Sequence, residues 1–225
     1  MTGRSRYGGT VAQKMTARST WYVRTVTSPT RPLRTDAARN RELLLAAAED
    51  EFAERGLAAS VADIARRAGV AKGTVFRHFA SKDDLIAAIV GENLAALAAV
   101  AEGLADAPDP GAGLLEFLTV AAERRQQRDL TFLQTVSEGD PRVDEVRTAL
   151  LAALDVLVDR AREAQAIRSD VTLADVFLLL CAPVHVVENL PDPPPDLWQR
   201  YLGIIFDGLR PEGARPLPQP PPQLR

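Results

Sequence analysis

The segment SVADIARRAGVAKGTVFRHFASKDDLI, residues 60–86, decides the fold because it carries two short helical patterns joined by a turn. In the first pattern, Ile64, Ala65 and Ala68 recur at the three- and four-residue spacing of one helix face. Gly69 follows them and tolerates the positive φ that a tight turn between two helices requires. The segment therefore predicts a helix, a turn and a second helix.

The second helical pattern has an apolar side and a polar side. Val75 and Phe79 are four residues apart and point into the protein, whereas Arg77 points away from it. The outward and flanking positions combine small, hydroxyl, aromatic and basic side chains, namely Lys72, Gly73, Thr74, Phe76, Arg77 and His78. The second helix of a helix-turn-helix enters the DNA major groove, where such side chains reach base edges and phosphates. We expect this face to bind DNA; the alternative is an ordinary helical hairpin with a charged outer face.

Two residues outside this helix, at the starts of the helices before and after it, are candidate phosphate contacts. Ser60 precedes the first helix with Asp63 three residues later, which is the pattern of a capping box, and Thr172 repeats it with Asp175. Lys82 lies in the first turn of the following helix, where free backbone N–H groups already attract phosphate.

The charge of the chain is unevenly distributed. The net charge is −3, yet residues 1–34 hold seven basic and no acidic side chains. Residues 60–82 have a net charge of +4, and residues 91–225 a net charge of −9. A local basic patch on a weakly acidic protein suits a polyanion bound at one end, although a solvated charged face would show the same pattern.

Helical patterns fill nearly all of the chain between its ends. Leu44, Ala48 and Phe52 form an apolar stripe on a first helix that ends at Gly56. We find no strand pattern and no repeat, so the predicted class is all-α. Further helices are expected at about 81–106, 111–128, 130–138, 141–165, 172–189 and 196–209.

The motif resembles the DNA-binding signature of the TetR family of bacterial transcription regulators over about residues 37–90. Phe76 stands where that family more often has Tyr, which removes a hydroxyl, and Arg77 lies where the family varies, so it is a candidate for choosing the DNA sequence. The matching features are Ile64-Ala65, Ala68-Gly69-Val70, Gly73-Thr74, the aromatic Phe76, His78-Phe79, and Lys82 followed by Leu85.

The resemblance implies a domain organisation and a mechanism. It implies a three-helix DNA-binding domain at 35–90 and a larger helical regulatory and dimerisation domain at 91–210. It also implies a homodimer on a near-palindromic operator and a small-molecule effector. Around these domains we expect a disordered basic arm at 1–34 and a Pro-rich disordered tail at 211–225. A translation start at Met15 or later would account for the arm equally well.

The arm supplies two more candidates for DNA binding. The stretch LRTDAARNR, residues 33–41, resembles one subgroup of the same family. In that setting Arg31 and Arg34 are candidates to lie along a phosphate or to enter a minor groove, as basic arms do. The alternative is that both arginines are simply solvated.

The last two predicted helices, 172–189 and 196–209, carry the most apolar surface. A helix that is apolar nearly all round must be covered on all sides. The resemblance places the dimer contact on these helices; an entirely intramolecular core is the alternative. The candidate residues for lining an effector site are Phe117, Phe132, His185 and Trp198; the alternative is that each belongs to the core.

Other function classes find little support in the sequence. The two histidines, His78 and His185, have no partner at catalytic spacing, and we find neither a phosphate loop nor a metal cluster, so we expect no enzyme, no metal and no cofactor. The single cysteine, Cys181, is expected to be a buried inert thiol. We find no apolar run of the ~18–20 residues that cross a bilayer and no signal peptide, so we expect a cytoplasmic protein.

The predicted function is therefore DNA-binding transcriptional regulation. Within this class we expect a ligand-responsive repressor. A regulator without an effector, or an activator, would be built from the same residues.

Overall fold

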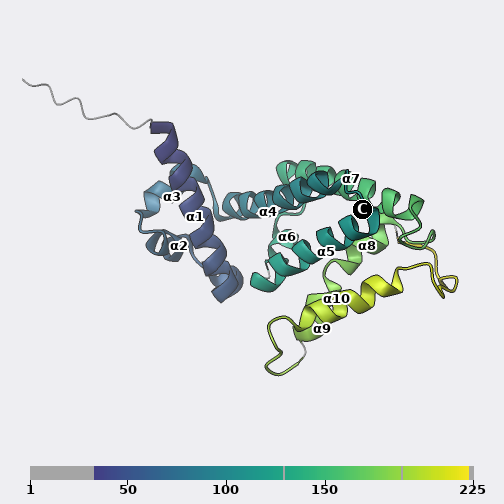
Figure 1. Cartoon of the computed structure of the whole chain (residues 1–225). Helices are drawn as coiled ribbons and strands as arrows, with labels where there is room; N and C mark the ends of the chain where they lie inside the picture. The colour runs from purple at the N-terminus through teal and green to yellow at the C-terminus, as the bar shows by residue number, and fades with distance from the viewer. Residues whose placement is uncertain (1–32, 129, 189, 223–225) are drawn as a thin grey trace, which may run out of the picture.

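The computed structural model describes residues 33–128, 130–188 and 190–222, and every regular element in these ranges is a helix (Figure 1). The predicted all-α class is confirmed. The elements are α1 (Leu33–Arg55), the 3₁₀ turn η1 (Gly56–Ala58), α2 (Val61–Arg67), α3 (Lys72–His78), α4 (Lys82–Leu104), α5 (Pro110–Gln127), α6 (Phe132–Val136), α7 (Pro141–Glu163), α8 (Leu173–Leu179), α9 (Ala182–Glu188) and α10 (Leu197–Gly208).

The helices α1, α2 and α3 pack together at one end of the molecule (Figure 1). The predicted stripe on α1 forms their core, since the side chains of Leu44, Ala48 and Phe52 are each fully buried. Ile64 of α2 and Val75 of α3 belong to the same buried cluster. The helix-turn-helix predicted from the sequence is therefore present and held on a third helix.

Local backbone chemistry fixes where α2 begins and ends. The Ser60 hydroxyl accepts a hydrogen bond from the Asp63 N–H at 3.2 Å, which closes the predicted capping box. Gly69 adopts a φ of +69°, as expected of the turn residue. The chain then re-enters a helix at Lys72 without a side-chain cap.

The helix α4 connects this end of the molecule to the remaining helices (Figure 1). We expected no apolar run long enough to span a membrane, but by length and composition α4 is such a run. In this structure the apolar side chains of α4 are buried within the protein. Leu85, Ile86 and Leu94 lie in the core, and α4 packs along α7. The boundary predicted between residues 90 and 91 falls inside this continuous helix.

The helix predicted at 172–189 is in fact two helices. The chain leaves helical geometry after Leu179 and resumes it at Ala182. Pro183 explains the break, because it has no N–H to donate to the carbonyl of Leu179 and its ring would clash there. Cys181 lies in the gap and is partly exposed, which corrects the expectation of a buried thiol.

The start of the described chain differs from expectation, whereas its end lacks helix as the Pro-rich sequence predicts. The helix α1 begins at Leu33, ahead of the stretch from which it was predicted. After α10, residues 210–222 form no helix, and the Arg168 guanidinium donates to the carbonyl of Arg215. Residues 1–32 and 223–225, which hold most of the predicted arm and the end of the predicted tail, lie outside the described residues.

The turn at Gly69 yields a stability prediction. Gly69→Ala places a side chain at a φ of +69°, which costs about 1–2 kcal/mol for an L-residue. The free energy of unfolding should fall by that amount in urea denaturation at one fixed protein concentration.

Gly73→Ala is the matched control for this substitution. Gly73 lies in α3 with open space around its Cα, so its replacement should not lower the free energy of unfolding and should raise it by up to about 1 kcal/mol, because Ala favours a helix more than Gly does. Equal losses in the two variants would contradict the role assigned to the turn.

Candidate nucleic-acid interface and ligand cavity

The helix α3 divides its side chains between the core and the solvent as the sequence predicted. Val75 and Phe79 are 1% and 3% exposed. Phe76, a large apolar side chain, is 45% exposed on the other side. The structure brings the predicted outward residues together on this surface: Lys72, Gly73, Phe76 and Arg77 are exposed, and Thr74 and His78 are partly exposed.

The outer surface of α3 carries cations that no carboxylate neutralises among the residues the structure describes. The Lys72 ammonium lies 5.8 Å from the centre of the Phe76 ring. On the inner side, the Arg41 guanidinium of α1 lies 5.5 Å from the Phe79 ring. An aromatic ring accepts a cation on its face, so these contacts orient Lys72 outward and help hold Phe79 in place. The surface can attract phosphate because Lys72 and Arg77 remain available to it.

The nearest predicted contact, Ser60, is occupied within the protein. Its hydroxyl donates to the Asp63 carboxylate at 2.6 Å, and the Arg66 guanidinium donates to the other carboxylate oxygen at 2.5 Å. The Ser60 hydrogen bond and then the Arg66 hydrogen bond lower the pKa of Asp63 to about 2. A phosphate at Ser60 would lie beside this carboxylate, so the predicted contact has a competitor.

Lys82 is likewise held by a contact within the protein. Its ammonium donates to the carbonyl of Leu57 at 2.5 Å and lies 5.5 Å from the Phe52 ring. The predicted arm residue Arg31 lies outside the described residues, and of Arg34 only the backbone is described, in the first turn of α1. The structure therefore groups six predicted contacts on α3 and gives Ser60 and Lys82 partners within the protein. It does not describe the side chains of Arg31 and Arg34.

An ion-pair network behind the surface fixes α2 on α1, and the sequence analysis missed it. The Arg67 guanidinium donates to Glu51 at 2.9 Å and to Glu54 at 2.5 Å. Glu51 is 3% exposed, and a carboxylate so deeply buried needs a cationic partner. The signal was present, since Glu51 follows Ala48 by three residues on the apolar stripe of α1.

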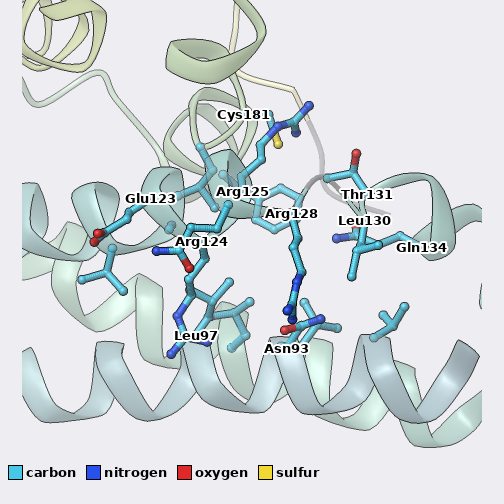
Figure 2. A pocket seen from close by; sticks show the side chains of 18 of the residues that line it. Asn93, Leu97, Glu123, Arg124, Arg125, Arg128, Leu130, Thr131, Gln134 and Cys181 are labelled. Carbon is cyan, nitrogen blue, oxygen red and sulfur yellow. The ribbon is translucent and has the colours of Figure 1, made fainter. Parts of the chain in front are cut away.

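A cavity of about 1030 Å³ lies where α1 meets the helices of the second part of the chain (Figure 2). Its lining comes from α1, α4, α5, α7 and α8 and from the segment around α6. Val90, Leu94 and Leu97 of α4 form an apolar wall. Cavities of this size hold small organic ligands.

None of the four predicted ligand residues lines this cavity. Phe117 and Trp198 are 0% and 3% exposed and fill the core, Phe132 is partly buried at the start of α6, and His185 is exposed on α9. The cavity instead takes several arginines from the end of α5, where the sequence reads ERRQQR at residues 123–128. This arginine-rich stretch is the feature of the sequence that could have indicated the cavity. Within the described ranges no group of three or more His, Cys, Asp or Glu side chains is placed to hold a metal ion.

Comparisons with known proteins agree with this geometry. Residues 44–89 match the family of bacterial regulatory proteins called the tetR family, and residues 109–211 match the SbtR-like C-terminal domain of transcriptional regulators. The crystal structure of the TetR transcription regulatory protein from Mycobacterium vanbaalenii is 34% identical, covers 80% of this chain and 99% of that one, and superposes with a TM-score of 0.59. A structure described as the molecular basis for control of antibiotic production by a bacterial hormone is 30% identical, with 80% and 100% coverage and a TM-score of 0.54.

A curated relative matches the DNA-binding end alone. The HTH-type transcriptional repressor Rv3405c of Mycobacterium tuberculosis is 56% identical over 48 residues, which is 21% of this chain and 26% of the repressor. The chain thus spans about a quarter of that relative's length.

Fold, surface and comparisons together define a DNA-binding transcriptional regulator of the helix-turn-helix type. The chain belongs to the TetR family, which consists of regulators rather than enzymes.

The Ser60 contact yields a prediction about titration. Ser60→Ala removes the largest cause of the low Asp63 pKa, so this pKa should rise from about 2 toward 3.8 in an NMR titration of the carboxyl carbon. Because the folded-state pKa is depressed, Asp63 stabilises the wild-type fold above about pH 4 and loses that contribution as the pH falls toward 2.

Thr172→Ala removes the hydroxyl of the second capping box and should leave the Asp63 pKa unchanged. A wild-type Asp63 that titrates at its ordinary value would contradict the geometry assigned to the start of α2.

Proposed function

We propose that the protein is a ligand-responsive repressor that binds a near-palindromic operator as a homodimer. The observation that carries the DNA half is the exposed, cation-bearing surface of α3, fixed in place by the buried Val75 and Phe79. The expected contacts to DNA are Ser60, Lys72, Gly73, Thr74, Phe76, Arg77, His78 and Lys82, joined by Arg31 and Arg34 of the arm.

The residues of α3 have different expected roles in the groove. A Cβ added at Gly73 would meet no other atom within 4 Å, so the helix backbone is open there and can approach DNA closely. Phe76 offers its ring to a sugar or a thymine methyl group, and Thr74 offers a hydroxyl to a phosphate. Arg77 has the fork of donors that binds guanine bidentately, whereas Lys72 acts as a point charge on phosphate.

The homodimer is supported by an apolar stripe left uncovered on the last helices. Ile204 of α10 is 56% exposed and Val186 of α9 is 43% exposed. Gly203 and Gly208 flank Ile204 on the exposed side of α10, so another helix can approach closely there. Operator binding by such a dimer requires the two copies of α3 to lie about one DNA turn apart, ~34–36 Å.

The proposal also covers the direction of regulation, the site of the effector and the cellular location. The relative matched at the DNA-binding end is named a repressor, and one related structure is described in terms of control by a bacterial hormone. The cavity beside α1 offers room for an effector close to the DNA-binding helices. A ligand acts there by favouring an arrangement whose recognition helices no longer match the groove spacing. The protein would act in the cytoplasm, where it meets chromosomal DNA.

Substitutions on α3 test the DNA contacts on an operator selected from random duplexes. Arg77→Ala should weaken binding by about 1–3 kcal/mol and relax the preference at one base pair, because it removes a base contact. Lys72→Ala should weaken binding to all sequences and lower the slope of log affinity against log salt by about 1 per site. Fluorescence anisotropy at several salt concentrations measures both effects.

Arg162→Ala is the control for these measurements. Arg162 pairs with Asp159 near the end of α7, far along the chain from α3. If Lys72→Ala and Arg77→Ala behave like this control, the reading surface has been assigned to the wrong helix face.

A charge placed on the uncovered stripe tests the dimer. Ile204→Glu should give a monomer in sedimentation equilibrium, because an interface would have to bury an unpaired carboxylate. Operator affinity should fall with it by about tenfold or more, since one half-site remains.

Val156→Glu provides the matched control on another helix. Val156 of α7 is 46% exposed, close to the 56% of Ile204. It should leave the dimer intact, and an Ile204→Glu protein that still sediments as a dimer would refute the proposed interface.

A further inference from the structure

The wall of the cavity beside α1 carries more positive than negative charge. Four arginines of α5 and α7 line it, namely Arg124, Arg125, Arg128 and Arg147. Two carboxylates, Glu49 and Glu123, line it as well. Arg147 is paired with Asp144 at 3.5 Å, so the guanidinium groups that can attract an anion are those of Arg124 and, once its own ion pairs are exchanged, Arg128.

The same cavity has an apolar wall opposite its arginines. Figure 2 shows Arg128 extending from the end of α5 toward α4, where Asn93 and Leu97 face the same space. Val90 and Leu94 of α4 continue that wall. A ligand that satisfies both sides is amphipathic, with an oxyanion at one end and an apolar body.

Arg128 also joins the cavity to the DNA-binding helices. Its guanidinium donates to Glu49 at 2.6 Å and forms an ion pair with Asp50 at 2.8 Å, both on α1. We call this contact the Arg128 clasp. The Arg128 side chain is 42% exposed, and exposed ion pairs contribute little, so the clasp can be broken by a competitor.

We propose that the cavity binds a small amphipathic anion. Its carboxylate, sulfonate or phosphate group replaces Glu49 and Asp50 as the ion-pair partner of Arg128. A guanidinium binds such oxyanions bidentately, and the interaction is stronger where the apolar body of the ligand excludes water. This inference rests on the proposed ligand-responsive regulation, for which it supplies the class of ligand and the contact that responds.

Opening the clasp changes the contact between α5 and α1. The ligand and the two carboxylates of α1 compete for one guanidinium, so binding of either disfavours the other. An anion in the cavity therefore releases the DNA-binding helices from the end of α5. It follows that removing the carboxylates should strengthen binding of the anion.

Two dyes with the same aromatic body test this proposal on the full chain. Anilinonaphthalenesulfonate carries a sulfonate, and phenylnaphthylamine is the same molecule without it. Fluorescence titration should show that the wild-type chain binds the sulfonate dye about tenfold tighter, as one charge-assisted contact implies. Arg128→Ala should remove this preference while leaving affinity for the neutral dye within about twofold.

Replacing the two carboxylates that compete for Arg128 tests whether Arg128 binds the anion. If Arg128 had only a structural role, this replacement would not change the affinity for the sulfonate dye. The double variant Glu49→Gln with Asp50→Asn should bind the sulfonate dye about two- to fivefold tighter than wild type. Arg162→Ala, which removes an arginine outside the cavity, should bind both dyes as wild type does. Arg128→Gln keeps a polar side chain but removes the charge, and it should behave like Arg128→Ala.

Operator binding by the same proteins separates the two proposals. Saturating sulfonate dye should lower the operator affinity of wild type about threefold or more and should not affect Arg128→Ala. Equal affinity for the two dyes, no gain in the double variant, or an operator affinity indifferent to the dye would each overturn the inference. Absence of operator binding without any dye would instead overturn the proposed function.

Discussion

The place of α3 on the protein depends on the burial of Val75 and Phe79. A helix of seven residues is not stable by itself in water, because so few hydrogen bonds do not offset the cost of nucleation. Burying an apolar side chain of this size contributes about 1.5–3 kcal/mol. These two contacts therefore decide both that the helix forms and which side it turns outward. The exposed cations, and with them DNA binding, follow from that orientation.

The sequence predicted the elements whose causes are local. Capping at Ser60, the positive φ at Gly69 and the two faces of α3 depend on residues within a turn or two of one another, and each was found as expected. The clasp was not predictable in this way. Arg128 and Glu49 are 79 positions apart, and only the tertiary fold brings them together.

The cavity was missed for a related reason. The sequence predicts large aromatic side chains as the lining, but in the structure they fill the core, where burying a large apolar area stabilises the fold most. Phe117, for example, is fully buried there. The cavity lies between α1 and the helices that follow the DNA-binding end, whose side chains do not fill the space between them. Its wall is then made of side chains that tolerate water, such as the arginines that end α5. Spacing along one helix does not reveal such a place.

The contacts between the two ends of the molecule are of two kinds, and their difference suits a regulator. Apolar contacts run along α4, which carries core residues for α1 to α3 at its start and packs on α7 farther along. Ion pairs lie at the periphery, where Arg128 holds α1 and Arg142 of α7 holds Asp84 of α4 at 2.6 Å. Exposed ion pairs are weak and screened by salt, whereas apolar burial is not. A small ligand can therefore exchange the peripheral contacts without unfolding the core, so the DNA-binding helices can change their setting on α4 and remain folded.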